Sequence, residues 1–304
     1  MTSPDEVPTR LAKVAGPDGQ PRWAVLDDAG AAGLLPPGTT LGSLLALDAA
    51  ALGETLGAVP RAPAASPALL APVDDDTEVW AAGVTYEVSR QARMTESTEA
   101  GIYAKVYTAT RPELFFKGVG WRVAGPGAPI GVREDSTWDV PEPELGVVCD
   151  AAGRIAGYTV VNDVSSRSIE GENPLYLPQA KIFRGACAVG PWIRLASAVP
   201  DPYRLGIAVR ILRDGGLAWS GQTSTARLRR KLDELASYLY RGDVFPRGVI
   251  LATGTSAVPG DDVTLQQGDE VVIEIEGVGT LANPVLRGLA AFQDAPAAGK
   301  GLLA

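Results

Sequence analysis

Short apolar segments of β character recur from Glu78 onward, and they constrain the fold more than any other feature of the sequence. Clusters of turn residues separate the segments, and each segment has the length of an ordinary strand. We predict strands at residues 79–84, 145–149, 157–164, 192–195, 207–212, 249–253 and 271–275. Turn-rich stretches that suit hairpins lie at residues 150–153, 213–216 and 267–269.

Only one segment of this region has the clear spacing of an amphipathic helix, at residues 224–240. Its leucines repeat with helical periodicity, at Leu228, Leu232, Leu235 and Leu239. Thr223 or Ser224 could cap its N-terminus. The polar segment 86–111 follows a strand end and could be a mobile lid over a site. The predicted fold class is therefore mainly β with some helices (α+β).

The first 72 residues have a different composition, rich in Ala, Leu, Gly and Pro. A strand-like piece at 23–26 precedes leucine-rich segments around 41–56, and residues 59–72 contain four prolines, as a linker or crossing segment does. We predict a small N-terminal domain and linker at residues 1–72 and a larger catalytic domain at residues 73–304.

Composition and charge narrow the possible functions. The chain has 304 residues, 46% of them hydrophobic, which is enough for a substantial core. With 27 basic and 36 acidic residues the net charge is −9, which argues against nucleic acid as a partner. No apolar run is long enough for a membrane span, and the N-terminus lacks the features of a secretory signal. We therefore expect a cytoplasmic protein in which Cys149 and Cys187 are reduced core residues.

The chain contains no histidine, which removes whole classes of chemistry. A Ser-His-Asp triad, a Cys-His protease site and a His-ligated zinc or haem site are all impossible. A metal ion would need oxygen ligands, or less plausibly the two cysteines. A general base would have to be Glu, Asp, Lys, Tyr or a metal-bound hydroxide.

Three carboxylates form the pattern that points most directly to chemistry. Glu142 and Glu144 are two positions apart, so on a strand both side chains project from one face. Such a pair repels unless a cation neutralises it. Asp163, near the end of a second predicted strand, could supply a third oxygen ligand, and such an oxygen shell suits Mg²⁺ or Mn²⁺. By spacing alone, a solvated strand face and a turn aspartate are also compatible with these residues.

Several ordered motifs across residues 78–286 resemble the fumarylacetoacetate hydrolase superfamily. They include Gly83-Val-Thr-Tyr86, Glu142-Pro-Glu144-Leu145, residues 157–165, Lys181, Gly190-Pro191-Trp192, Thr253-Gly254-Thr255 and residues 268–284. Longer stretches at 83–94, 111–117, 136–144 and 170–181 resemble its 2-keto-3-deoxy-D-arabinonate dehydratase branch. The resemblance implies a β-rich roll with a small N-terminal domain and, in many members, a homo-oligomer.

The resemblance also implies roles for particular residues. The metal ligands for Mg²⁺ (Mn²⁺ is possible) would be Glu142, Glu144 and Asp163, with Lys181 and Glu113 as catalytic groups and with Thr255, Arg90 and Ser89 binding substrate. Structural readings stay open for the residues other than the ligands, as a salt bridge, a turn or surface positions. Hydrolases of the superfamily carry a His-Glu pair where this chain has Ser89 and Ala92, so their usual activation of water is missing. Ser168 stands where an acidic residue is more usual, and we assign it no role.

These residues together predict a Mg-dependent dehydratase that converts a 2-keto-3-deoxy sugar acid, of the 2-keto-3-deoxy-D-arabinonate type, to 2,5-dioxopentanoate through a metal-stabilised enolate. The alternative enzyme is a C–C hydrolase, decarboxylase or tautomerase acting on acylpyruvate-like 2-keto acids. A third reading is a family member that only binds a ligand or partner.

Overall fold

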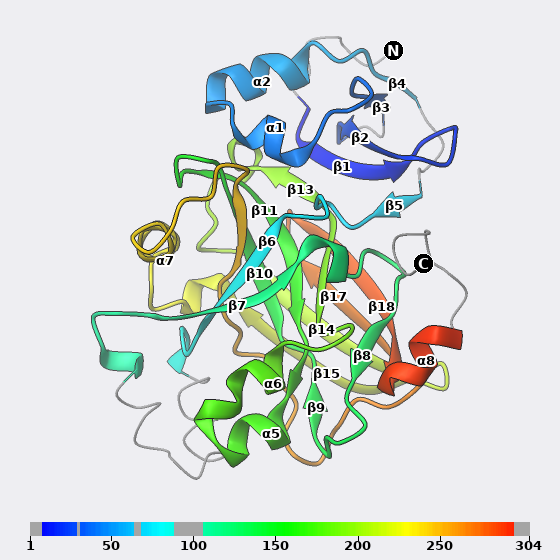
Figure 1. Cartoon of the computed structure of the whole chain (residues 1–304), viewed down its shortest axis with the longest axis vertical. Helices are drawn as coiled ribbons and strands as arrows, with labels where there is room; N and C mark the ends of the chain where they lie inside the picture. Colours follow the sequence, from blue (N-terminus) through cyan, green and yellow to red (C-terminus); the bar gives the residue numbers. More distant parts are fainter. Residues whose placement is uncertain (1–7, 29–30, 64–67, 88–105, 295–304) are drawn as a thin grey trace.

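The computed structural model describes residues 8–28, 31–63, 68–87 and 106–294, and most of its strands lie in one large mixed sheet (Figure 1). The strand order is β4 (Ala62–Pro63), β3 (Ala31–Leu34), β2 (Pro21–Leu26), β1 (Arg10–Ala15), β13 (Cys187–Leu195), β11 (Ile155–Asp163), β10 (Pro143–Cys149), β16 (Val249–Ala252), β6 (Glu78–Gly83) and β7 (Glu113–Val119). A further strand, β5 (Leu69–Leu70), pairs with β1. The predicted class, mainly β with some helices, is confirmed.

A second sheet packs against the large one, and short helices lie around the two. Its order is β15 (Gly216–Ser224), β14 (Gly206–Arg213), β17 (Glu270–Ile275), β18 (Gly279–Arg287) and β8 (Ile130–Val132), while β9 (Asp139–Val140) pairs with β12 (Ser165–Ser166). The α-helices are α1 (Leu41–Leu45), α2 (Ala49–Gly57), α5 (Arg167–Glu172), α6 (Leu177–Lys181), α7 (Leu232–Leu239) and α8 (Gly288–Asp294). Single 3₁₀ turns are η1 (Gly120–Arg122), η2 (Pro174–Tyr176), η3 (Ala196–Ala198) and η4 (Thr225–Arg227).

The central strand β10 is buried on both faces, which explains why its sequence is apolar apart from Glu144. Successive side chains of a strand point to opposite faces. Val147 accordingly joins the core between the two sheets, with residues such as Ile273 of β17. Val148 faces the other way, into a second core that includes Leu41 of α1 and Leu56 of α2. The centre of the large sheet is therefore held from both sides.

Each predicted strand has a counterpart in the structure, with ends that differ by a few residues. Two of the predicted hairpin turns are also present, between β10 and β11 and between β14 and β15. The prediction at residues 267–269 is wrong, because this turn leads into β17 without joining two paired strands. The hairpin that β17 forms is with β18, across residues 276–278.

The predicted helix at residues 224–240 is shorter in the structure, where α7 begins only at Leu232. Ser224 still belongs to β15 and pairs with Gly206 of β14, and Leu228 forms an isolated bridge with Tyr86. Pairing with a neighbouring strand satisfies the backbone there, so the local helical periodicity does not decide the structure. Ser224 caps η4 by accepting a hydrogen bond from the Ala226 amide (3.2 Å), and α7 has no side-chain N-cap.

The N-terminal strands continue the large sheet through the antiparallel pairing of β1 with β13 (Figure 1). A domain boundary at residue 72 therefore stays a prediction. Both cysteines are buried free thiols, as predicted. Among the residues that the structure describes, no helix has the length and apolar character that crossing a membrane requires.

Candidate active site

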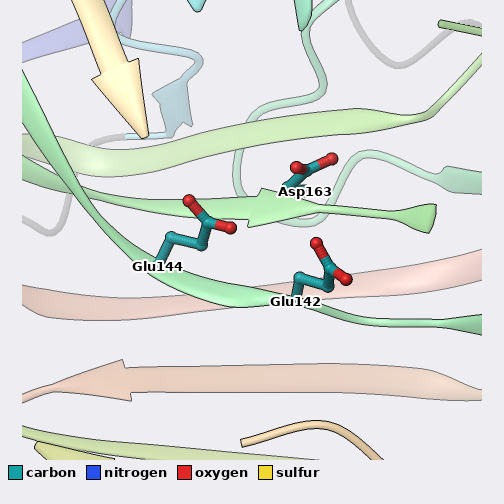
Figure 2. Close-up of side chains that lie close together, drawn as sticks. All are labelled: Glu142, Glu144 and Asp163. Carbon is teal, nitrogen blue, oxygen red and sulfur yellow. The ribbon is translucent and has the colours of Figure 1, made fainter. Parts of the chain in front are cut away.

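Antiparallel pairing of β10 with β11 brings three carboxylates to one place (Figure 2). Glu142 directly precedes β10, Glu144 lies on it, and Asp163 is the last residue of β11. The Asp163 amide donates to the Glu142 carbonyl (3.0 Å), which fixes the two strand ends beside each other. One carboxylate oxygen from each residue lies within 4.8 Å of the other two, and all three side chains are buried. The alternative of a solvated strand face is therefore excluded.

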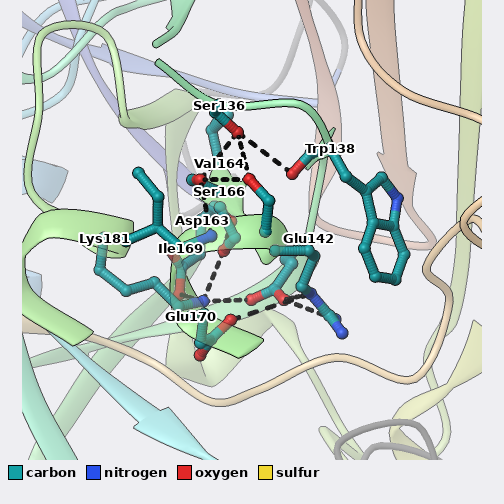
Figure 3. A network of polar contacts seen from close by, with 12 residues as sticks. Ser136, Trp138, Glu142, Asp163, Val164, Ser166, Ile169, Glu170 and Lys181 are labelled. Atoms are coloured by element: carbon teal, nitrogen blue, oxygen red, sulfur yellow. Dashed lines mark hydrogen bonds and ion pairs between the residues drawn. The ribbon is translucent and has the colours of Figure 1, made fainter. Parts of the chain in front are cut away.

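Lys181, the last residue of α6, reaches into this cluster (Figure 3). Its Nζ donates to Glu142 Oε2 (2.6 Å), to Asp163 Oδ2 (3.0 Å) and to Ser165 Oγ (2.5 Å). Lys181 Nζ is therefore surrounded by three hydrogen-bond acceptors, two of them carboxylates of the cluster. Lys181 therefore forms ion pairs with two of the three carboxylates, and its catalytic role stays a prediction.

Two charged residues of α5 complete the site, and the residue-by-residue interpretation of the sequence missed both. Arg167 donates from Nη2 to Glu142 Oε1 (2.8 Å), and its Nε lies 3.9 Å from Glu170 Oε2. Both side chains are buried (Figure 3 shows Glu170). A signal existed for Glu170, which opens one of the stretches that resemble the dehydratase branch. For Arg167 the only sequence signal was its position four residues after Asp163.

Lys117 of β7 is a third residue that the sequence interpretation missed, and its buried side chain contacts the carboxylate cluster. Its side chain is 1% exposed, and its Nζ lies 2.5 Å from Asp163 Oδ1. The same Nζ donates to the carbonyls of Val164 (2.9 Å) and Lys181 (2.7 Å). Burial lowers the pKa of Lys117, an effect that the charge of Asp163 opposes. Lys117 lies at an irregularity in the pairing of β7 with β6, where Gly118 is opposite Val79 and Phe116 is opposite Trp80.

Glu144 is held by the loop that follows β16. Its Oε2 accepts a hydrogen bond from the amide of Gly254 (2.6 Å). Burial, followed by the charges of Asp163 and Glu142, raises the pKa of Glu144 well above its ordinary value. Negative charge is therefore crowded at this point, and a cation placed among the three carboxylates would relieve the crowding.

A pocket contains most of the predicted site residues. Its lining consists of Ala82, Gly83, Val84, Glu113, Phe115, Glu142, Glu144, Asp163, Arg167, Glu170, Lys181, Gly254 and Thr255. Val84 has a φ of +52°, a strained conformation for a β-branched residue, and such strain is concentrated at functional sites. Ser89 and Arg90, like most of the expected lid, lie outside the described residues. Ser168 belongs to a serine cluster instead and contacts Ser136 Oγ at 3.0 Å.

The charges of the pocket fit a divalent cation. Its acidic side chains are Glu113, Glu142, Glu144, Asp163 and Glu170, and the cationic ones are Lys181, Arg167 and, behind Asp163, Lys117. Among the described residues, five acidic side chains thus face three basic ones. Buried carboxylates crowded in this way are stable when ionised only if positive charge balances them. Oxygen ligands from three carboxylates suit Mg²⁺ or Mn²⁺ rather than a softer metal.

Comparison with known proteins agrees with this fold. The family model described as fumarylacetoacetate (FAA) hydrolase C-terminal matches residues 79–286, from the start of β6 to the end of β18. The chain belongs to the fumarylacetoacetate hydrolase family.

Particular relatives narrow the identification. A probable 2-keto-3-deoxyxylonate dehydratase of Haloferax volcanii is 53% identical over 70% of this chain and 73% of its own length. A 2-dehydro-3-deoxy-D-arabinonate dehydratase of Saccharolobus solfataricus is 48% identical over 69% of this chain and 72% of its own. A solved 2-keto-3-deoxy-D-arabinonate dehydratase, complexed with magnesium and 2,5-dioxopentanoate, is 36% identical with a TM-score of 0.81, covering 91% of this chain and 99% of that one.

Proposed function

We propose that this chain is a Mg-dependent dehydratase that removes water from a 2-keto-3-deoxy sugar acid of the 2-keto-3-deoxy-D-arabinonate type and yields 2,5-dioxopentanoate. The observation that carries the proposal is the buried cluster of Glu142, Glu144 and Asp163 in a pocket whose acidic side chains outnumber its basic ones. Similarity to two dehydratases at 48–53% identity supports the reaction and the substrate class.

In this proposal Glu142, Glu144 and Asp163 hold Mg²⁺, with Mn²⁺ as a possible substitute. When bound, the ion would polarise the 2-keto group of the substrate and so make the neighbouring C3 protons more acidic. The Gly254 amide orients Glu144, and Lys117 orients Asp163. Thr255, at the edge of the pocket, would donate to the substrate carboxylate, and Arg90 and Ser89 would contact the substrate from the expected lid.

The hydrogen bonds suggest how Lys181 and Glu113 divide the proton transfers. Lys181 Nζ points at three hydrogen-bond acceptors, so in this proposal Lys181 serves as a hydrogen-bond and proton donor and not as a base. It would supply positive charge beside the 2-keto oxygen and a proton to the leaving C4 hydroxyl. Glu113 is the remaining carboxylate on the β7 side of the pocket, and it would take the C3 proton.

The decisive experiment is a discontinuous assay of the purified protein with Mg²⁺ and 2-keto-3-deoxyarabinonate. We expect 2,5-dioxopentanoate to form, to stop with EDTA and to resume with added Mg²⁺. Glu144→Gln should lose activity by a large factor, whereas Glu274→Gln, at an exposed position of β17, removes the same charge without effect.

The absence of product from any 2-keto-3-deoxy acid would refute the proposal. Turnover of an acylpyruvate or of oxaloacetate in its place would favour the hydrolase or tautomerase alternative. A cytoplasmic location and a homo-oligomeric state accompany the proposal as predictions.

A further inference from the structure

The product of the proposed reaction requires more proton transfers than the loss of water itself. Loss of a C3 proton and of the C4 hydroxyl, which leaves as water, gives a C3=C4 double bond conjugated to the 2-keto group, with C5 still an alcohol. To reach the C5 aldehyde, a C5–H bond must break. Its electron pair forms C4=C5, while the former C3=C4 pair binds a proton at C3. The resulting C5 enol then loses its O–H proton and gains a proton at C4.

This sequence balances without a redox cofactor, because C5 is oxidised while C3 and C4 are reduced. It requires a proton to be removed from carbon at two separate places on the substrate, C3 and C5. A single carboxylate beside C3 would have to move along the chain to serve both. A pocket with a second carboxylate near C5 would complete the reaction within one bound state.

Two ends of the pocket can be distinguished, because Lys181 and Arg167 bind different carboxylate oxygens of Glu142. Lys181 binds Glu142 Oε2 (2.6 Å), and its Nζ lies over the ring of Phe115 at 5.5 Å from the ring centre. Phe115 is two positions after Glu113 on β7, so both side chains are on the same face of that strand. Glu113 therefore belongs to the Lys181 end of the pocket.

The other end is formed by α5. Arg167 binds the second oxygen of Glu142, Oε1 (2.8 Å), and its Nε lies 3.9 Å from Glu170 Oε2. Glu170 thus faces the pocket from the side of Arg167, where it is 3% exposed. The Glu170 carboxylate is therefore a buried acid–base group that lines the pocket beside the three candidate metal ligands.

We propose that Glu170 is the base that removes a C5 proton of the dehydrated intermediate and so completes conversion to the aldehyde. Arg167 is the positioning residue for Glu170. Its guanidinium contacts both Glu142 and Glu170, and so holds Glu170 at a set distance from the carboxylate cluster. This inference rests on the proposed function and assigns Glu113 and Glu170 to the two separate proton abstractions, at C3 and at C5.

The test is Glu170→Gln, which keeps the length of the side chain and an oxygen that can accept from Arg167. We expect exchange of the substrate C3 protons with solvent deuterium to continue near the wild-type rate. Formation of 2,5-dioxopentanoate should fall on the order of 10²–10⁴-fold, the usual effect of a lost acid–base group. The conjugated 5-hydroxy-2-oxopent-3-enoate should then accumulate, visible by its ultraviolet absorbance. Glu172→Gln is the matched control, since it removes an exposed carboxylate from the same helix.

Aldehyde formation at the wild-type rate by Glu170→Gln would overturn the inference and leave the proposed function standing. Loss of C3 exchange in a folded Glu170→Gln protein would overturn it too, since Glu170 would then serve the first step. Absence of any dehydration by the wild-type enzyme would instead refute the proposed function.

A measurement on the unaltered enzyme tests the same inference if the variant does not fold. Substrate carrying deuterium at only one of the two C5 positions should give an aldehyde that keeps either all or none of the label, because one fixed base removes one hydrogen. A mixture of labelled and unlabelled aldehyde would indicate spontaneous rearrangement in solution and would contradict the assignment.

Discussion

Gly254 shows how single atoms set the geometry of the carboxylate cluster. Its amide donates to Glu144, and its φ of +89° lies in the region that favours glycine. A Cβ added here would lie 2.0 Å from Thr85 Oγ1. That hydroxyl cannot turn away freely, because it donates to the Thr253 carbonyl (2.6 Å). Loop conformation and ligand orientation therefore depend on each other at this residue.

We expect Gly254→Ala to lower the free energy of unfolding by more than the roughly 1–2 kcal/mol of a left-handed alanine, and to weaken Mg²⁺ binding. Gly268→Ala is a matched control, because Gly268 has a φ of +90° and nothing within 4 Å of its added Cβ. Denaturant unfolding of both variants separates crowding from backbone strain. Equal losses in the two variants would show that the contact with Thr85 is unimportant.

At the scale of secondary-structure elements, Lys117 joins three segments that are distant in sequence. It extends from β7 to the Asp163 carboxylate at the end of β11, to the Val164 carbonyl and to the C-terminal carbonyl of α6 at Lys181. Each contact is buried, so each polar group would be left unsatisfied without it. Lys117 therefore helps to hold the C-terminal end of α6, and with it the backbone of Lys181, beside the carboxylates.

Lys117→Met keeps most of the apolar volume and removes the charge. Breaking a buried ion pair from one side typically costs about 3–5 kcal/mol, so a loss of that size is expected in denaturant unfolding. Lys231→Met, at the exposed N-cap of α7, removes the same charge and should cost at most about 1 kcal/mol through its contact with Tyr203. A Lys117 variant as stable as the Lys231 variant would contradict the role of Lys117 as a buried clamp.

At the scale of the whole molecule, metal binding depends on folding, because the candidate ligands come from two strand segments that are adjacent only in the folded chain. A ligand that binds only the folded state stabilises it by about 2.7 kcal/mol at 100 times its Kd. We expect Mg²⁺ to raise the midpoint of thermal unfolding in proportion to the logarithm of its concentration, and EDTA to reverse the rise. Glu142→Ala should abolish the increase, while Glu274→Ala should retain it. A Glu142→Ala protein that is stabilised as strongly as the wild type would place the ion elsewhere.

The sequence by itself determined the class of fold, the exclusion of histidine chemistry and the three carboxylates. These follow from local rules, since alternation along a strand places Glu142 and Glu144 on one face whatever surrounds them. Tertiary structure decided the rest. It shortened the expected helix to Leu232–Leu239, because pairing of the backbone with β14 outweighed local periodicity.

Tertiary structure also brought Lys117, Arg167 and Glu170 to the carboxylates, and no local pattern predicts such convergence. Lys117 is 47 residues from Val164, whose carbonyl it binds, and β10, β16 and β6 lie between β7 and β11 in the sheet, so the contact depends on tertiary packing. Arg167 and Glu170 depend on the direction in which α5 leaves β12. Charge types can be counted in a sequence, but which charges are buried together depends on how the strands and helices pack.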